Sequence, residues 1–176
     1  MFAQFAQRYN AALETHPVAT KMLMTAGIVG TGDIMTQYFI EKRTIKDFDW
    51  MRLARMAGLG AFLIGPVLHH WYGYLYRVMP GTDIPTVIKR VALDQFTFAP
   101  VFTATFFTAI FTLEGRLDHL PKHFEDNYVD ALKVNWLMWI PAQVINFSFI
   151  PPQHAVLFAN FIALFWNSYL SWSSHQ

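Results

Sequence analysis

The sequence predicts an all-α integral membrane protein, a helical bundle of four to five spans with an N-terminal amphipathic helix. Hydrophobic residues make up 54% of the 176 residues and charged residues only 14%, whereas about a quarter of the residues in a soluble domain are charged. Long segments also lack Asp, Glu, Lys and Arg, and the last of them covers 134–176. Helices that cross a bilayer need about 20 such apolar residues. We therefore expect a single membrane domain over 1–176.

Composition also excludes several functions. The net charge is +1 and no stretch is rich in Lys and Arg, so we expect no direct nucleic-acid binding. The absence of cysteine excludes disulfides and thiolate metal sites. His119 and His123 have the spacing of metal ligands, but no third ligand is placed with them. No phosphate loop or nucleophile elbow is present, so we expect no enzyme, cofactor or metal site.

Residues 1–16 are predicted to form a helix at the membrane interface. Their apolar residues recur at intervals of three and four, as on one face of a helix: Phe2, Phe5, Tyr9 and Leu13. A short cap on the end of the bundle is the alternative interpretation.

The first span is predicted near 18–40, although it contains Asp33. A charge near mid-membrane costs roughly 2.5–3.5 kcal/mol on insertion scales, so this helix needs packing to stabilise it. Small residues at four-residue spacing would allow a close approach to another helix: Ala26 and Gly30, and Gly27 and Thr31.

The second and third spans are predicted near 56–78 and 85–113, after a charged segment, 41–55, which we expect to be an aqueous loop. Trp71 belongs to an aromatic belt at the end of the second span. In the third span Asp94 heads a stripe with helical spacing, expected to be a wetted wall or a packing face: Thr97, Val101, Thr105, Thr108 and Thr112.

The last two spans are predicted near 134–150 and 153–172, with a break at Pro151 and Pro152. The polar segment 115–133 before them is expected to be a loop or a surface helix, and Pro141 a site of kinking. Both spans carry polar residues on one face: Asn135, Trp139, Gln143 and Asn146 on the first, and Gln153, Asn160 and Asn167 on the second. These amides suit either hydrogen bonding between helices or the lining of a pore.

Short motifs follow one another along the whole chain. They are Gly32-Asp33 with Gln37, Gly65-Pro66 with His69 and Trp71-Tyr72, Lys89 with Asp94-Gln95 and Phe98-Ala99-Pro100, Asn135-Trp136 with Trp139 and Gln143, Asn146-Phe147, and Trp166-Asn167-Ser168-Tyr169-Leu170-Ser171. In this order and spacing they resemble the family of Mpv-seventeen and peroxisomal membrane protein twenty-two. The resemblance implies a helical organellar membrane protein, with channel activity that modulates membrane potential and a link to mitochondrial DNA through nucleotide supply.

The resemblance also implies a location. His16-Pro17, Gly32-Asp33-Ile34 and the closing Trp-Asn-Ser-Tyr-Leu-Ser-Trp are most similar to the family's mitochondrial inner-membrane members. The peroxisomal membrane is the alternative.

Polar residues within or beside the predicted spans are the candidates for a pore or polar cavity. They are Asp33, Gln37, Lys89, Arg90, Asp94, Gln95, Asn135, Trp139, Gln143, Asn146, Asn160 and Asn167. Asp33 and Asp94 would set the charge preference, and Lys89 and Arg90 would recruit phosphate or nucleotides at an entrance. We therefore expect a channel or transporter for ions or small metabolites, surrounded by membrane lipid.

Each candidate has a structural alternative. Asp33 and Gln37 would also serve as a hydrogen bond between helices, and Arg90, one turn before Asp94, would neutralise it. The alternative function is a non-conducting scaffold, homo-oligomeric through its small-residue faces. An enzyme acting on a lipid or metabolite is the third hypothesis, and no pattern in the sequence supports it.

Overall fold

The computed structural model describes the backbone of residues 2–174 and the side chains of residues 7–166, and all regular structure in this part is helical. The α-helices are α1 (Phe2–Thr15), α2 (Pro17–Met35), α3 (Trp50–Leu59), α4 (Gly65–Val78), α5 (Ile84–Leu93), α6 (Ala99–Leu113), α7 (Leu120–Phe149) and α8 (Ala155–Ser174). The segments η1 (Thr36–Ile40), η2 (Gly60–Ile64) and η3 (Asp94–Phe98) are π-helical, and η4 (Leu117–His119) and η5 (Pro152–His154) are 3-10 turns.

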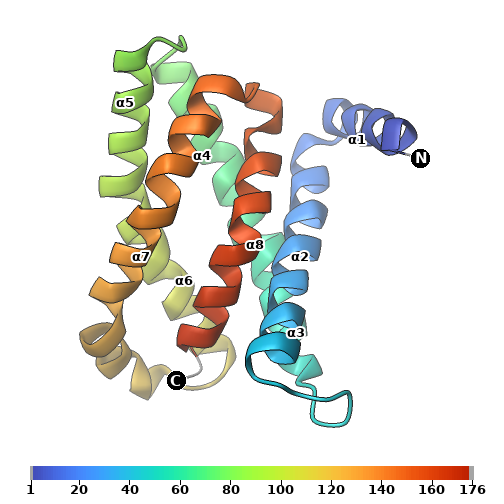
Figure 1. The fold of residues 1–176 in the computed structure, drawn as a ribbon, viewed down its shortest axis with the longest axis vertical. Helices are drawn as coiled ribbons and strands as arrows, with labels where there is room; N and C mark the ends of the chain where they lie inside the picture. The colour runs from blue at the N-terminus through green and yellow to red at the C-terminus, as the bar shows by residue number, and fades with distance from the viewer. Residues whose placement is uncertain (1, 175–176) are drawn as a thin grey trace.

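The π-helical segments join these helices into longer rods. Segment η1 extends α2, η2 connects α3 to α4, and η3 connects α5 to α6. Together with α7 and α8, the described residues form five rods that run alongside one another, whereas α1 lies crosswise at one end of α2 (Figure 1). A π-turn inserts a residue into a helix and is frequently found at functional sites.

Two rods begin before the charge-free segments from which their spans were predicted. The second starts at Trp50 because the Asp49 carboxylate caps it, accepting a hydrogen bond from the Arg52 amide at 2.9 Å. The expectation of a loop was therefore wrong for residues 50–55. Helix α7 starts at Leu120, in a charged stretch where the Lys122–Asp126 ion pair spans one turn. It continues through Pro141 to Phe149.

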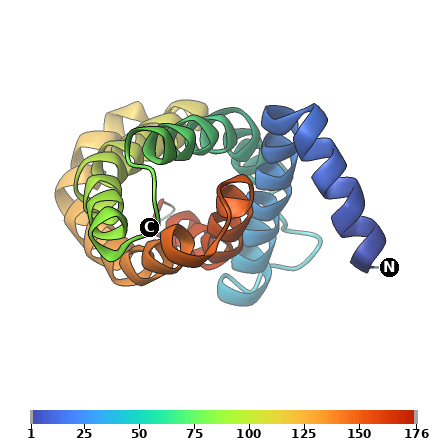
Figure 2. The same ribbon diagram turned by 90° about the horizontal axis from the view of Figure 1, so that it is seen from above.

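The rods enclose a common core. Helix α2 packs against α8 and against the α3–η2–α4 rod, while α7 contacts α5, α6 and α8, so that the rods surround a central region when seen from above (Figure 2). Two glycines allow the first two rods to approach. A Cβ added at Gly60 would lie 3.0 Å from the Ala26 Cα, and one at Gly65 would lie 3.0 Å from the Met22 Cα.

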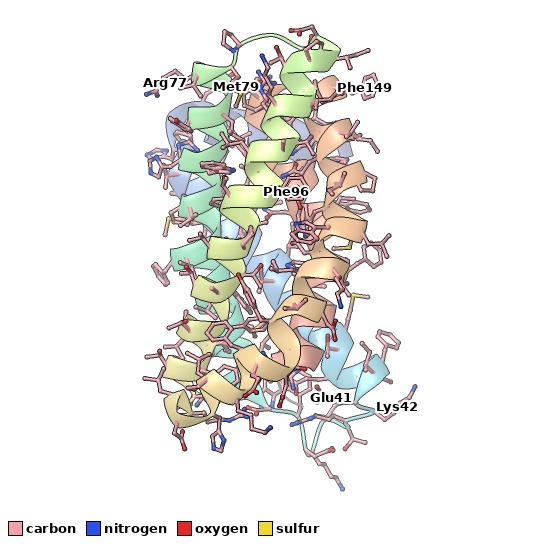
Figure 3. All side chains as sticks on the ribbon, turned by 90° about the vertical axis from the view of Figure 1, so that its left-hand side faces the viewer. Glu41, Lys42, Arg77, Met79, Phe96 and Phe149 are labelled. Atoms are coloured by element: carbon pink, nitrogen blue, oxygen red, sulfur yellow. The ribbon has the colours of Figure 1, made fainter. Side chains whose placement is uncertain are left out.

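Large apolar side chains face outward along the whole bundle. Leu23, Phe62 and Leu137 are 75–80% exposed. Figure 3 shows the exposed Phe96 at mid-height, between one end that carries Arg77 and Phe149 and another that carries Glu41 and Lys42. Inside, charged and amide side chains are buried. Soluble monomers rarely expose so much apolar surface, so this distribution indicates a lipid environment.

Two stretches within the described residues are long and apolar enough to cross a membrane, Trp50–Val78 and Ile84–Leu113. In the second, the predicted threonine stripe is not on the interior face. Thr105, Thr108 and Thr112 are exposed, and each hydroxyl donates to the carbonyl four residues earlier. The π-turn at η3 explains this difference, because one inserted residue rotates the following helix by about 100° relative to Asp94.

Candidate functional site

Asp94 lies at the start of η3, in the interior of the bundle, with 2% of its surface exposed. Three side-chain N–H groups donate to its carboxylate. They come from Trp71 Nε1 at 2.6 Å, Gln95 Nε2 at 2.7 Å and Gln143 Nε2 at 2.8 Å. Arg90 and Asp94 do not pair, and within the described residues no cation lies within ion-pair distance of Asp94. Its carboxyl group is therefore held by neutral donors alone.

Amide side chains extend this arrangement across the bundle. Gln143 also donates to the Tyr72 hydroxyl at 2.9 Å, and Asn146 donates to Gln143 Oε1 at 2.9 Å. On the other side, Asn135 donates to Gln95 Oε1 at 2.9 Å. We call this set of hydrogen-bonded side chains the Asp94 network: Trp71, Tyr72, Asp94, Gln95, Asn135, Gln143 and Asn146. It connects α4, η3 and α7, which are distant in the sequence.

A cavity of about 60 Å³ adjoins the Asp94 network. Its polar wall contains Asp94, Gln95, Asn135 and Gln143, and Trp139 also lines it; its apolar wall is Ile64, Leu68, Phe98, Ala99, Phe102, Phe106, Ala163 and Trp166, with Tyr72 and Thr103 completing it. Since one water occupies about 30 Å³ in the liquid, the cavity has room for about two water molecules. The structure thus brings together Asp94, Gln95, Asn135, Trp139 and Gln143 of the predicted site.

Asp33 and Gln37 belong to a different cluster. Arg52 donates to Asp33 at 2.8 Å and to Glu41 at 2.7 Å, and Gln37 donates to Asp33 at 2.8 Å. Gln37 also exchanges hydrogen bonds with the backbone of Asp49. Neither Asp33 nor Gln37 lines the cavity beside Asp94. Asp33 and Gln37 are therefore separate from the cavity at Asp94, and a buried arginine from the next rod pairs with the aspartate.

Glu41 lies at the loop end of this Arg52 cluster. Its partial burial would raise the pKa of the carboxyl group, but hydrogen bonds and charge from Arg52, together with the charge of Arg43, outweigh burial and lower that pKa. Glu41 is therefore ionised at neutral pH and shares the Arg52 guanidinium with Asp33.

The other predicted residues are dispersed. Lys89 is exposed, while Arg90 is buried one turn before Asp94 and donates to the Met79 carbonyl. Asn160 donates to the Thr25 hydroxyl at 2.9 Å and so connects α8 to α2. Asn167 lies outside the residues whose side chains the structure describes.

Sequence reasoning missed three participants. Arg52 was assigned to an aqueous loop, and Trp71 to an interfacial belt. Tyr72 was not predicted to contribute to a polar site. A signal for Arg52 was available, because Asp49 three residues earlier is a favoured N-cap and predicts a helix over Arg52.

The chain matches known proteins over almost its full length. It is 40% identical to Protein SYM1 of Gibberella zeae over 176 residues, 99% of each chain. It is 35% identical to the mitochondrial inner membrane protein Mpv17 of Xenopus laevis over 169 residues and to that of Homo sapiens over 170 residues, in both cases 96% of each chain. Residues 111–171 match the model of the Mpv17 / PMP22 family. The chain belongs to this family. No solved structure matches it.

Membership of the Mpv17 / PMP22 family confirms the predicted resemblance and the all-helical membrane class. The relatives named as mitochondrial inner membrane proteins cover the chain almost end to end, which confirms the predicted inner-membrane location. The Mpv17 relatives are called membrane proteins, and none of the three names indicates a catalytic role.

Proposed function

We propose that this protein of the mitochondrial inner membrane is a channel or transporter for ions or small metabolites. The observation that carries the proposal is the cavity beside Asp94. Acidic side chains inside membrane proteins mark ion or substrate pathways, and this one has three neutral donors and lines an internal space. A cation that enters the cavity would find the carboxylate together with the amide oxygens of Gln95 and Asn135.

We place part of each of the five rods across the bilayer, with 134–150 as the spanning part of α7, and α1 at the membrane surface. The first rod is 17–40 and the last is Ala155–Ser174. Each of the five contains at least the roughly 20 residues that a membrane span requires. The opposite ends of the bundle carry Arg77 and Glu41 (Figure 3). Apolar side chains, Phe96 among them, cover the surface between these ends.

The structure corresponds to a closed state in this proposal. A space of about 60 Å³ holds water or a dehydrated ion, so a larger permeant requires α6 and α7 to separate. The π-turn at η3 is suited to such a change, because its hydrogen bonding is irregular at Asp94. By family resemblance, we propose that the transport affects membrane potential and the nucleotide supply for mitochondrial DNA.

Flux through reconstituted liposomes tests the proposal. Wild type should conduct a monovalent cation above the level of empty vesicles, and Asp94→Asn should reduce the cation flux or shift cation-over-anion selectivity by about tenfold. Asp130→Asn is the matched control, because it removes the same charge from an exposed position on α7. Equal flux in wild-type and empty vesicles contradicts a conducting role, and unchanged flux and selectivity in Asp94→Asn contradict a pathway through the cavity beside Asp94.

One observation favours a scaffold as the second candidate. Every polar side chain of the Asp94 network makes at least one hydrogen bond, so the network also explains helix association without any permeant. Gly27 and Gly73 leave open space for a neighbouring helix of a second copy. The same liposomes decide between the two functions: a scaffold forms oligomers detectable by crosslinking and carries no flux.

A further inference from the structure

Arg90 is a second buried arginine, and its environment differs from that of Arg52. Its surface is 1% exposed, and Nε donates to the Met79 carbonyl at 3.0 Å. NH2 donates to the same oxygen. The guanidinium carbon lies 4.4 Å from the centre of the Tyr76 ring and 5.9 Å from that of Phe147. The NH1 group is buried and has no hydrogen-bond partner in the described part of the chain.

No described carboxylate forms an ion pair with Arg90. Arg52 contacts two carboxylates, whereas no carboxylate of residues 7–166 lies within 4.0 Å of Arg90. Asp83 acts on Arg90 only from a greater distance, and its carboxylate caps α5 by accepting a hydrogen bond from the Thr86 amide at 3.2 Å. Arginine remains charged in proteins, and a buried charge without a counter-ion is strongly unfavourable. An anion from outside the chain would compensate it.

A pocket of about 390 Å³ opens beside this guanidinium. It lies between the turn from α4 to α5 and the turn from α7 to α8, and it shares no residue with the cavity at Asp94. Arg90, Tyr76, Thr82 and Ser148 contribute its polar side chains, and Pro80, Gly81, Phe149, Ile150, Pro151 and Pro152 complete the wall. The Tyr76 hydroxyl is also buried without a hydrogen-bond partner in the described residues. Two residues with unpartnered polar groups thus line one pocket.

We propose that this pocket binds a phosphate-class oxyanion. Arg90 NH1 would supply a charge-assisted hydrogen bond and the Tyr76 hydroxyl a second donor, which suits the oxygen-rich surface of a phosphate group. The pocket lies at the end of the bundle that carries Arg77 and Phe149 (Figure 3). At this end of the bundle the ligand would be either a soluble phosphate compound or the phosphate of a lipid headgroup. The proposal does not require transport through the cavity at Asp94.

Thermal unfolding of the purified full-length protein in detergent tests the site with inorganic phosphate as the probe. Sodium phosphate, titrated against sodium chloride at constant ionic strength, should raise the Tm of wild type in a saturable manner. Arg90→Gln should weaken the apparent Kd by at least about tenfold, the effect of one charge-assisted hydrogen bond. Arg77→Gln, which removes an exposed charge at the same end of the bundle from a residue outside the pocket, should leave the Kd unchanged. No shift in wild type beyond that of chloride overturns the proposal, as does an equal Kd in Arg90→Gln.

Two further variants test the site if Arg90→Gln does not fold. Tyr76→Phe removes only the hydroxyl, and Ser148→Leu fills part of the pocket; each should weaken the phosphate Kd severalfold. An unchanged Kd in both overturns the proposal. Asp94→Asn should retain the phosphate shift, so that a failure of the transport hypothesis is distinguishable from a failure of this one.

Nanodiscs identify the source of the anion. In discs of phosphatidylcholine alone, free phosphate should still raise the Tm. If discs containing phosphatidic acid raise the Tm of wild type but not of Arg90→Gln and abolish the response to free phosphate, a lipid headgroup occupies the pocket. If the response to free phosphate persists there, a soluble phosphate compound is the ligand. A Tm increase with phosphatidic acid that is equal in Arg90→Gln contradicts headgroup binding at this site.

Discussion

Arg52 on α3 donates from Nε to Oδ1 of Asp33 on α2 at a distance of 2.8 Å, and both side chains are at least 99% buried. This ion pair joins the first two rods at the end of the bundle where Glu41 provides a second carboxylate. It explains how an acidic residue is accommodated in the first rod, since Asp33 is neutralised when the second rod packs beside it.

Removal of one partner of this pair should destabilise the fold strongly. Asp33→Asn leaves the Arg52 guanidinium buried with reduced compensation, and Arg52→Met leaves two carboxylates without their cation. Each should lower the free energy of unfolding by about 3–5 kcal/mol, as for other buried pairs broken on one side. Chemical unfolding in detergent measures this loss.

Arg43→Met is the control for this prediction. Arg43 pairs with Glu41 at 2.8 Å but is 32% exposed, so its loss should cost at most about 1 kcal/mol. A double variant, Asp33→Leu with Arg52→Met, should be more stable than Arg52→Met alone. Similar losses for Arg52→Met and Arg43→Met contradict the structural importance of the buried pair.

Trp71 should stabilise the fold through its indole N–H. Trp71→Phe keeps an aromatic ring against Phe98, which stacks on Trp71 at 4.5 Å, but removes the hydrogen bond to Asp94. Because that acceptor is a buried carboxylate, we expect a loss of about 1.5–3 kcal/mol in the free energy of unfolding. Trp50→Phe, at a position that is 65% exposed, should change it by no more than about 0.5 kcal/mol. Equal effects of the two variants argue against the hydrogen bond.

Gly60 should not tolerate even a methyl group. The Cβ of alanine at this position would lie 3.0 Å from both the Ala26 Cα and the Thr25 carbonyl oxygen, so two helix backbones must separate. We expect Gly60→Ala to destabilise the protein by about 1–3 kcal/mol. Gly58→Ala meets no atom within 4 Å and should be neutral or slightly stabilising. The Tm of the two variants, measured in one detergent, tests how closely the backbone of α2 approaches Gly60. An equal Tm for both variants contradicts this close approach.

His123 should make stability depend on pH. It lies in the first turns of α7, before the predicted span at 134–150, with its ring against Phe107 and Phe111. Burial lowers the pKa of its imidazole, and the charge of Arg116 lowers it further. The unfolded chain therefore takes up the proton at a higher pH than the folded chain, near pH 6.5. The stabilisation is complete above this value and is lost as the pH falls toward the lower pKa of the folded state.

The Tm of wild type at pH 7.5 and pH 5.5 measures this effect. The decrease on acidification should be smaller in His123→Phe, which retains an aromatic ring between the two phenylalanines and cannot be protonated. His119→Phe serves as the control, because His119 is 65% exposed, and it should retain the wild-type decrease. An unchanged decrease in His123→Phe excludes His123 as its origin.

The sequence by itself determined the membrane class, the approximate positions of the rods and the family. Long segments without charge need lipid in any fold, and Pro151 and Pro152 interrupt a helix wherever it packs. The helix starts were less predictable, because the capping of α3 by Asp49 extends its rod into a charged segment. Asp94, Gln95, Asn135 and Gln143 were predicted as polar-site residues because each is a polar side chain in an apolar run.

Only the tertiary structure decided which polar groups meet. Asp33 and Asp94 have the same chemistry and similar surroundings in the sequence, yet Asp33 pairs with Arg52, whereas Asp94 accepts hydrogen bonds from Trp71, Gln95 and Gln143. Likewise, Arg52 and Arg90 are both buried, but only Arg52 has carboxylates beside it. Residue spacing defines the face of one helix, whereas these pairings depend on how the rods pack and on a π-turn that rotates one half of a rod relative to the other.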